Sequence, residues 1–284
     1  MDLEKSFKVV IPAMSKFDTA EILGKPMLYH VYRRAVESGA EDVIVASSKK
    51  EILDLVESFG GIATYVAPDH ITGTDMIAEV AMARGFDDDE IIVNLHSDEP
   101  LMPPALIRKI AEDLHEHATL QITTLCEPII NPKDLLDTNS VKVVLNHRGF
   151  ALYFSRAAIP WDIESYSYEK DGITQVSPHH YKHIGIYAYR CMFLQQYLEW
   201  GRSPLGQMEG LEQLRVLWNG HKMHCSVSAE PLPIDIKKKS DLKIAEEYLS
   251  NHNMGSISEA KGDLDDLDVN DLDVNDIADT DSIG

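Results

Sequence analysis

Short apolar runs alternate with segments of helical periodicity along roughly the first third of the chain. Runs such as FKVVIPA and EDVIVASS carry apolar residues at nearly every position, which is typical of strands buried in a parallel sheet. Between them, apolar residues recur every three to four positions and glycines follow, as in helices. The predicted strands cover 7–13, 41–48, 62–68 and 90–100, and the predicted helices cover 23–39, 49–61 and 74–85. This alternation predicts an α/β fold with a Rossmann-like, mostly parallel sheet and helices on both faces.

The second half of the chain alternates less regularly. Its patterns predict helices at 105–117, 191–201, 210–220 and 240–250, and strands at 120–129, 141–149, 151–160, 182–190 and 221–231. We expect a mixed sheet here and a single domain over residues 1–250. Residues of about 7–105 would form one half and residues 106–250 the other.

The last segment, 251–284, has a different composition. Nine aspartates lie between Asp263 and Asp281, a DLDVN unit repeats, and no Lys or Arg follows Lys261. Such a segment buries too little apolar surface to offset its ordering entropy, which indicates a disordered acidic tail. Binding of Ca²⁺ or of a basic partner is the functional alternative, although the glycine of a tight Ca²⁺ loop is absent.

The net charge of the chain restricts the kinds of partner that it can bind. The net charge is −21, and without the nine aspartates of the tail it is still −12, which argues against a nucleic-acid-binding surface. An anionic substrate would need a few placed cations, backbone amides or a metal ion. The sequence shows no apolar run of membrane-spanning length and no signal peptide, and three cysteines without CxxC spacing fit a reducing compartment. We therefore expect a cytosolic protein without a membrane span.

Polar residues follow the ends of the predicted strands, where doubly wound sheets bind ligands. In HSDEP, Asp98 comes directly after a buried run and could hold Mg²⁺ in the crevice, or Asp98 or Glu99 could cap the next helix. In TGTD, Gly73 and Thr74 could cradle a phosphate with backbone amides, or the segment could be an ordinary turn and helix cap. Spacing alone leaves both alternatives open.

A group of histidines precedes the predicted strand at 182–190. His179, His180 and His183 form an HHxxH pattern that lacks the acidic partner of helical zinc sites. His183 lies on an alternating strand, where it could hydrogen-bond a polar ligand or serve a structural role.

Several motifs together resemble a known family. The order IPA, LGKPMxxHV, SDEP, VKVVL, ALYFSRAAIPWD, HIGIYAYR and LEQLR closely resembles CMP-Kdo synthetase, the 3-deoxy-manno-octulosonate cytidylyltransferase family, over about residues 7–250. The resemblance implies a nucleotide-diphospho-sugar transferase fold with a smaller subdomain that binds sugar and forms a homodimer. It also implies transfer of CMP from CTP to Kdo or a related eight-carbon acid sugar, with release of pyrophosphate and a role in lipopolysaccharide precursor synthesis.

The resemblance assigns roles to individual residues. An aspartate pair carries Mg²⁺ in the family, and the matching positions here are Asp98 and Asp235. The contacts to the acid sugar correspond to Arg156, His183, Tyr187, Glu212 and Gln213, and His96 replaces a glutamine near the sugar. The guanidinium of Arg156 would suit a carboxylate, because its fork can pair both oxygens.

The nucleotide side departs from the family pattern. The loop after the first strand is about six residues shorter and lacks two arginines and the first GKP, so that Lys16 is its one remaining cation. A third arginine of the family corresponds to Met76. Loss of a positioned charge-stabilising donor costs about 10²- to 10³-fold in rate. Two hypotheses follow: a working cytidylyltransferase in which Lys16 or a partner's residue serves the triphosphate, or a catalytically impaired relative that binds sugar or acts as a scaffold. A different nucleotide or sugar donor is a third alternative.

Overall fold

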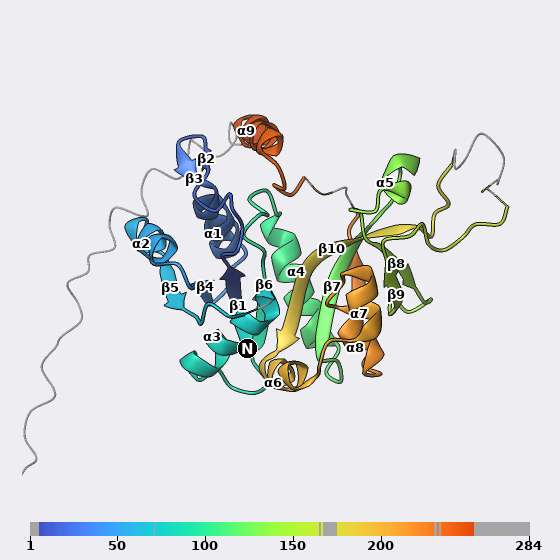
Figure 1. Ribbon diagram of the computed structural model, residues 1–284, viewed down its shortest axis with the longest axis horizontal. Coiled ribbons are helices and arrows are strands. Elements are labelled where there is room, and N and C mark those ends of the chain that lie inside the picture. The colour runs from blue at the N-terminus through green and yellow to red at the C-terminus, as the bar shows by residue number, and fades with distance from the viewer. Residues whose placement is uncertain are drawn as a thin grey trace, which may run out of the picture.

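The computed structural model describes residues 6–70, 72–164, 166, 175–229, 232 and 234–252. Its centre is a nine-stranded sheet in which seven strands follow the order β11-β7-β10-β6-β1-β4-β5, while β8 and β9 extend from β10 (Figure 1). The strands are β1 (Lys8–Pro12), β4 (Asp42–Ser47), β5 (Ile62–Tyr65), β6 (Ile91–Asn94), β7 (Ile122–Pro128), β8 (Lys142–Leu145), β9 (Ala151–Ser155), β10 (Tyr181–Arg190) and β11 (His224–Val227).

The strand directions make this a mixed, mostly parallel sheet. β1 pairs in parallel with β4 and β6, β4 with β5, and β11 with β7. The long strand β10 runs antiparallel to β6, β7 and β8, and β9 runs antiparallel to β8. The α/β class and the mixed sheet predicted from the sequence are therefore confirmed.

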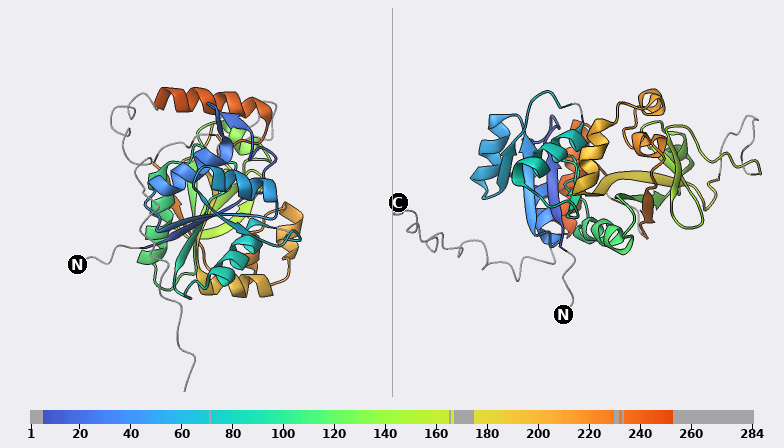
Figure 2. Two further views of the ribbon diagram at one scale, coloured as in Figure 1. Left: turned by 90° about the vertical axis from the view of Figure 1, so that its left-hand side faces the viewer. Right: turned by 90° about the horizontal axis from the view of Figure 1, so that it is seen from below.

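Helices cover both faces of the sheet. One face packs against α1 (Met27–Glu37), α2 (Lys50–Ser58) and α4 (Pro104–Glu116), and the other packs against α3 (Gly73–Arg84), α6 (Cys191–Glu199) and α8 (Leu214–Trp218). The closing helix α9 (Lys239–His252) lies across the hairpin of β2 (Glu21–Ile22) and β3 (Lys25–Pro26), at one end of the molecule (Figure 2).

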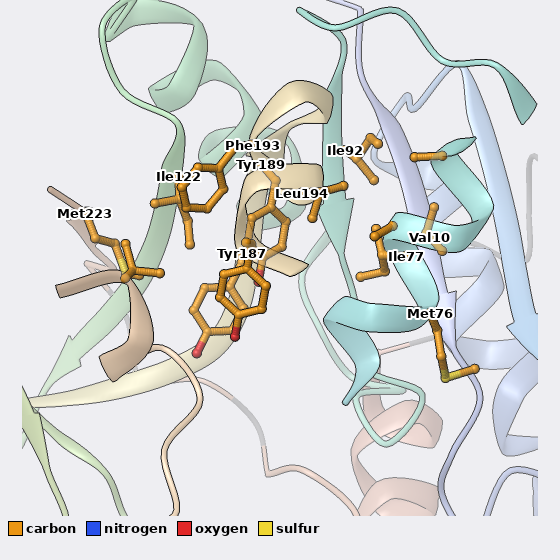
Figure 3. Close-up of a cluster of buried hydrophobic side chains, with 14 of the residues drawn as sticks. Val10, Met76, Ile77, Ile92, Ile122, Tyr187, Tyr189, Phe193, Leu194 and Met223 are labelled. Carbon is orange, nitrogen blue, oxygen red and sulfur yellow. The ribbon is translucent and has the colours of Figure 1, made fainter. Parts of the chain in front are cut away.

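Alternation along each central strand sends side chains into two separate cores. Val10 of β1 belongs to the core beneath α3 and α6, whereas its neighbours Val9 and Ile11 belong to the core beneath α1 and α4. Figure 3 shows side chains of β1, α3, β6, β10 and α6 meeting in the first of these cores. Tyr187 and Tyr189 of β10 stack there with ring centroids 5.8 Å apart.

The helix predicted over 23–39 begins later, at Met27. Glu21 and Ile22 pair with Pro26 and Lys25, and the turn between them places Leu23 at φ 51° and Gly24 at φ 73°. Two successive left-handed residues are typical of a tight hairpin turn, and glycine is the residue that adopts this conformation without strain.

Short elements of the second half escaped the sequence patterns. The helix predicted over 210–220 is reduced to α8, and α5 (Pro132–Leu136) and α7 (Pro204–Glu209) were not predicted. Helices of five or six residues contain too few turns to show periodicity. Ser203 before Pro204 and the left-handed Gly210 are the start and stop signals that could have located α7.

Beyond the carboxyl-terminal end of β7, the strands β8 and β9 and the helix α5 project from the sheet (Figure 1). The smaller subdomain and the division at residue 105 stay predictions. The acidic segment from residue 253 onward lies outside the described residues.

Core packing of α6 gives a first test of the fold. Phe193 is buried against Tyr189 and Trp200, so Phe193→Ala should lower the free energy of unfolding by about 3–5 kcal/mol in urea denaturation. The adjacent Met192 is half exposed, and Met192→Ala should change the same quantity by about 0.5 kcal/mol or less. Equal losses in the two variants would contradict the described orientation of α6.

Candidate active site

The order of the central strands defines a switch point between β1 and β6. From β1 the chain moves outward to β4 and β5, and then returns to the other side of β1 as β6 (Figure 1). The carboxyl ends of β1 and β6 therefore open onto the same edge of the sheet, where open α/β sheets bind ligands. The loop that follows β6 carries His96, Ser97 and Asp98 to this edge.

A backbone hydrogen bond brings the two predicted aspartates together. The amide of Ile236 donates to the carbonyl oxygen of Asp98 at 2.9 Å, which fixes the C-terminal segment beside the loop after β6. Asp98 and Asp235 consequently line one cavity of ≈270 Å³. The alternative in which Asp98 or Glu99 caps the next helix is wrong, because the N-cap of α4 is Pro103 and no side chain caps that helix.

The carboxyl groups at this cavity are held in a poorly solvated environment. Burial raises the pKa of Asp98; the nearby His96 opposes the rise and Asp235 adds to it. Burial and the same two aspartates raise the pKa of Glu99 to about 8. Convergent carboxylates that repel one another are a donor set suited to a hard divalent cation such as Mg²⁺. Asp98 and Asp235 are thus the residues that could hold the predicted metal ion.

Two lysines that the sequence analysis did not single out also line this cavity. Lys237 forms an ion pair with Asp235, with 2.5 Å between its Nζ and Oδ2, and Lys182 forms one with Glu127, with 3.1 Å between Nζ and Oε1. Burial disfavours the charge of Lys237, but Asp235 outweighs this effect and the pKa of Lys237 is raised. In the sequence, Lys182 could have been found by its position beside His183, and Lys237 by its place in the KKK run that follows Asp235 and Ile236.

An irregularity in the pairing of β10 with β7 shapes the wall of the cavity. The register shifts between Ile184 and Tyr187, and the hydroxyl of Thr124 fills the gap by donating to the carbonyl of Ile186 at 2.7 Å. The oxygen of Thr124 then accepts from Nε2 of His183 at 3.0 Å. Burial lowers the pKa of His183 to about 3, so this ring is neutral and its Nδ1 is unprotonated. His183, which the sequence pattern offered as a contact to a polar ligand, and Tyr187, which the resemblance assigned, both line the cavity.

The opposite wall carries Glu212 and Gln213, which precede α8. Oε1 of Glu212 accepts from the hydroxyl of Thr74 at 3.4 Å, whereas its Oε2 is buried with no hydrogen-bond partner among the described residues. Burial also raises the pKa of Glu212. A buried carboxyl oxygen without a partner is costly, and a bound ligand with hydroxyl groups would satisfy it.

A second hollow, of ≈230 Å³, adjoins the first at the end of β1. Its lining residues are Pro12, Met14, Ser15, Gly73, His96, Ser97 and Asp98, and these include no Lys or Arg. Thr72 caps α3 in a capping box with Asp75, so the helix-cap interpretation of this segment is correct. Gly73 nevertheless faces the hollow, and a Cβ added there would lie 3.2 Å from the ring of Pro12.

Three predicted site residues line neither cavity: Lys16, Arg156 and Thr74, whose buried hydroxyl contacts Tyr189 and Glu212 instead. Lys16 is exposed, and its Nζ lies 5.1 Å from the ring centroid of Phe17. Arg156 donates to the main-chain carbonyls of Glu209 at 2.7 Å, Thr138 at 2.8 Å and Gly210 at 3.4 Å, and it is absent from the lining of the main cavity. Its guanidinium holds the loop before Glu212 through these three hydrogen bonds, and its contact with an acid sugar stays a prediction.

The shortened loop after β1 contains a buried carboxyl that the sequence analysis missed. Asp18 is 1% exposed, and neither of its carboxyl oxygens has a hydrogen-bond partner among the described residues. Burial raises the pKa of Asp18 to about 7; the nearby hydroxyl of Ser97 and the charge of Lys49 oppose the rise, and the charge of Asp98 adds to it. Nothing in the pattern of apolar positions marks this residue, because an isolated Asp in a loop is usually exposed.

Comparison with known proteins identifies the class of protein to which the chain belongs. The cytidylyltransferase family profile matches residues 19–223, beginning just after the atypical part of the loop. A nucleotidyl transferase from Methanothermobacter thermautotroptrophicus, 14% identical with a TM-score of 0.53 over 87% of this chain and 99% of that one, has a similar fold. The family match and the fold are those of a nucleotidyltransferase.

Closer relatives define the family. The chain is 46% identical over 250 residues to 3-deoxy-manno-octulosonate cytidylyltransferase of Coxiella burnetii (strain Dugway 5J108-111), which covers 85% of this chain and 99% of that protein. It is 42% identical over 246 residues to the enzyme of the same name from Idiomarina loihiensis, with 84% of this chain and 97% of that protein covered. A solved CMP:2-keto-3-deoxy-manno-octonic acid synthetase complexed with CTP is 32% identical, with a TM-score of 0.77 over 87% of this chain and 100% of that one. The chain belongs to the 3-deoxy-manno-octulosonate cytidylyltransferase family.

The raised pKa of Asp18 predicts a stability effect of defined sign. An unfolded carboxyl ionises near pH 4, whereas the folded one ionises near pH 7, so the penalty for burying Asp18 grows across this interval and is complete above it. Asp18→Asn should therefore raise the free energy of unfolding at pH 8 by on the order of 4 kcal/mol and have little effect near pH 4. Urea denaturation without Mg²⁺ measures this, with the exposed Asp89→Asn as the control. A gain that is the same at both pH values would contradict the assignment.

Proposed function

We propose that this protein transfers CMP from CTP to Kdo or a closely related eight-carbon acid sugar. In this reaction a sugar hydroxyl oxygen forms a bond to the α-phosphorus of CTP, the bond from that phosphorus to the bridging oxygen breaks, and pyrophosphate leaves. The hydroxyl proton is released to solvent or to a nearby base. The observation that carries the proposal is the convergence of Asp98 and Asp235 on a cavity whose walls bear His183, Glu212 and Gln213. The family membership supports the same reaction.

We propose that Asp98 and Asp235 hold Mg²⁺ in this reaction. When bound, the ion would neutralise phosphate oxygens and align the α-phosphorus for attack. The adjoining hollow at the end of β1 is the candidate place for the triphosphate, and its lining offers no side-chain cation. Without an ion, phosphates would face the buried carboxylate of Asp98 directly, so we expect CTP binding to depend strongly on Mg²⁺.

For the acid sugar, we propose that Lys182 takes the part that the sequence analysis gave to Arg156. Lys182 lines the cavity next to His183, and its pair with Glu127 holds the ammonium in place. The unprotonated Nδ1 of His183 can accept a hydroxyl hydrogen, and the buried Oε2 of Glu212 can accept another. These contacts with the sugar hydroxyls would orient the attacking oxygen toward Asp98 and Asp235.

A homodimer and a cytosolic location complete the proposal. Large side chains of β9, α7 and α8 are exposed near the predicted subdomain, among them Leu152, Met208 and Trp218, and such residues are enriched at subunit interfaces.

No described helix is long and apolar enough to cross a membrane. The three cysteines are buried and unpaired, which fits a reducing compartment that supplies CTP. The acidic tail could still contact a basic partner.

The aspartate pair gives a direct kinetic test. With CTP, Mg²⁺ and Kdo, Asp98→Asn and Asp235→Asn should each lower kcat/KM for pyrophosphate release by at least about 10²-fold, because each removes a metal ligand. The matched control is Asp89→Asn, an exposed carboxylate near the other end of β6, which should keep normal activity. If the wild-type protein releases no pyrophosphate above background with Kdo or related acid sugars, the inactive, sugar-binding alternative replaces this proposal.

The proposed role of Lys182 predicts different effects on KM for the two substrates. Lys182→Gln should raise KM for Kdo by about tenfold, equivalent to about 1.4 kcal/mol, because it removes one charge–charge contact with the sugar carboxylate. KM for CTP should stay within about twofold of the wild-type value. Lys133→Gln, an exposed lysine of α5, is the control. A larger change in KM for CTP than for Kdo would place Lys182 on the nucleotide side and overturn the assignment.

A further inference from the structure

Three potential metal ligands meet at the far end of α4, away from the candidate active site. Asp113 lies in the last turn of α4, His117 follows that helix, and His224 is the first residue of β11. His224 pairs with Thr123 near the start of β7, whereas the cavity lies at the other end of β7. At 1.5 Å per residue, the 13 residues of α4 span about 20 Å, so His117 lies about that far from the N-terminus of this helix. Nothing in the proposed reaction uses this cluster.

The side chains converge on one carboxylate. Nδ1 of His224 lies 2.7 Å from Oδ2 of Asp113, and Nδ1 of His117 lies 3.2 Å from Oδ1 of Asp113. The three candidate ligand atoms all lie within 4.8 Å of one another. The two imidazole rings lie side by side with centroids 4.5 Å apart.

We propose that Asp113, His117 and His224 bind a divalent transition-metal ion of the Zn²⁺ type. Metal–nitrogen and metal–oxygen bonds of about 2.0–2.2 Å in a tetrahedron put neighbouring ligand atoms roughly 3.3–3.6 Å apart. The observed separations of 2.7 and 3.2 Å are shorter than this range, and Nδ1 of His117 also lies 2.9 Å from the main-chain carbonyl of Asp113. Coordination therefore needs the ligand atoms to move apart and the His117 ring to turn from that carbonyl toward the ion. Imidazole nitrogens favour zinc, nickel or copper over Mg²⁺, which separates this site from the oxygen donors of Asp98 and Asp235.

The surroundings hold two of the ligands firmly and leave one side open. The side chains of Asp113 and His224 are 8% and 16% exposed, and that of His117 is 35% exposed. A Cβ added at Gly149 would lie 2.6 Å from Nε2 of His224, and the ring of Phe150 meets His224 edge-on at 5.4 Å. The partly exposed His117 provides the route by which an ion and its remaining water ligand reach the site.

A bound ion would join the end of α4 to the beginning of β11. The chain that leaves β11 reaches Asp235 eight residues after Val227, so the same strand leads from the metal cluster to the candidate active site. The expected effect is structural: a metal ion that binds the folded protein alone raises its melting temperature. Because protons compete with metals for imidazole nitrogen, binding should weaken in acid.

The test uses full-length protein stripped with a chelator and titrated with Zn²⁺ or Co²⁺ at pH 7.5. We expect one equivalent bound with a Kd of about 10 μM or tighter, a rise in melting temperature, and visible Co²⁺ absorption typical of a four-coordinate site. His117→Asn should weaken this equivalent at least about tenfold and abolish the Co²⁺ band. His115→Asn is the matched control, since His115 lies two residues away and its ring contacts the carbonyl of Ser6.

The variants also separate this site from other metal-binding groups of the chain. Weak equivalents bound by the acidic tail or by other histidines should persist in His117→Asn, whereas the tight equivalent should disappear. Equal zinc affinity in the wild type and His117→Asn, or no binding by the wild type up to about 100 μM zinc, would overturn the proposal. Asp113→Asn, which keeps the shape of the side chain, provides a second variant. Loss of transferase activity has no bearing on these readouts.

Discussion

The hydrogen bond from the amide of Ile236 to the carbonyl of Asp98 is the contact on which the candidate active site depends. It joins two segments that are more than 130 residues apart and places Asp235 beside the loop that leaves β6. Helix α9 follows this segment and packs against the β2–β3 hairpin in a cluster that includes Ile236, so that packing also holds the segment in place. Without this docking, Asp98 would face the cavity alone, and the site would offer a cation only one of its two carboxylates.

The charges around this contact determine how the site could accept a triphosphate. The cavity is acidic, its two lysines are already paired with carboxylates, and the neighbouring hollow has no cation among its lining residues. The loop after β1 buries Asp18 and leaves its cation, Lys16, exposed. We propose that a divalent ion supplies the positive charge with which such a site accepts a triphosphate.

The sequence predicted the fold class, and it located several residues that line the cavity, because both follow from patterns of buried strands. Asp98 and His183 belong to apolar or alternating runs whose ends or faces can be located by periodicity. The resemblance added Tyr187, Asp235, Glu212 and Gln213. The directions taken by long side chains could not be predicted: Arg156 turns to main-chain carbonyls, and Lys16 lies over Phe17. Lys182, Lys237 and Asp18 were missed because their positions depend on tertiary packing rather than on local spacing.

Anomalous diffraction from crystals grown with CTP and Mn²⁺ in place of Mg²⁺ tests the central claim most directly. The account predicts a manganese peak within about 2.3 Å of carboxylate oxygens of both Asp98 and Asp235, with phosphate oxygens of CTP completing the coordination. A peak bound to only one of these aspartates, or CTP bound in the hollow with no metal between it and Asp98, would contradict it.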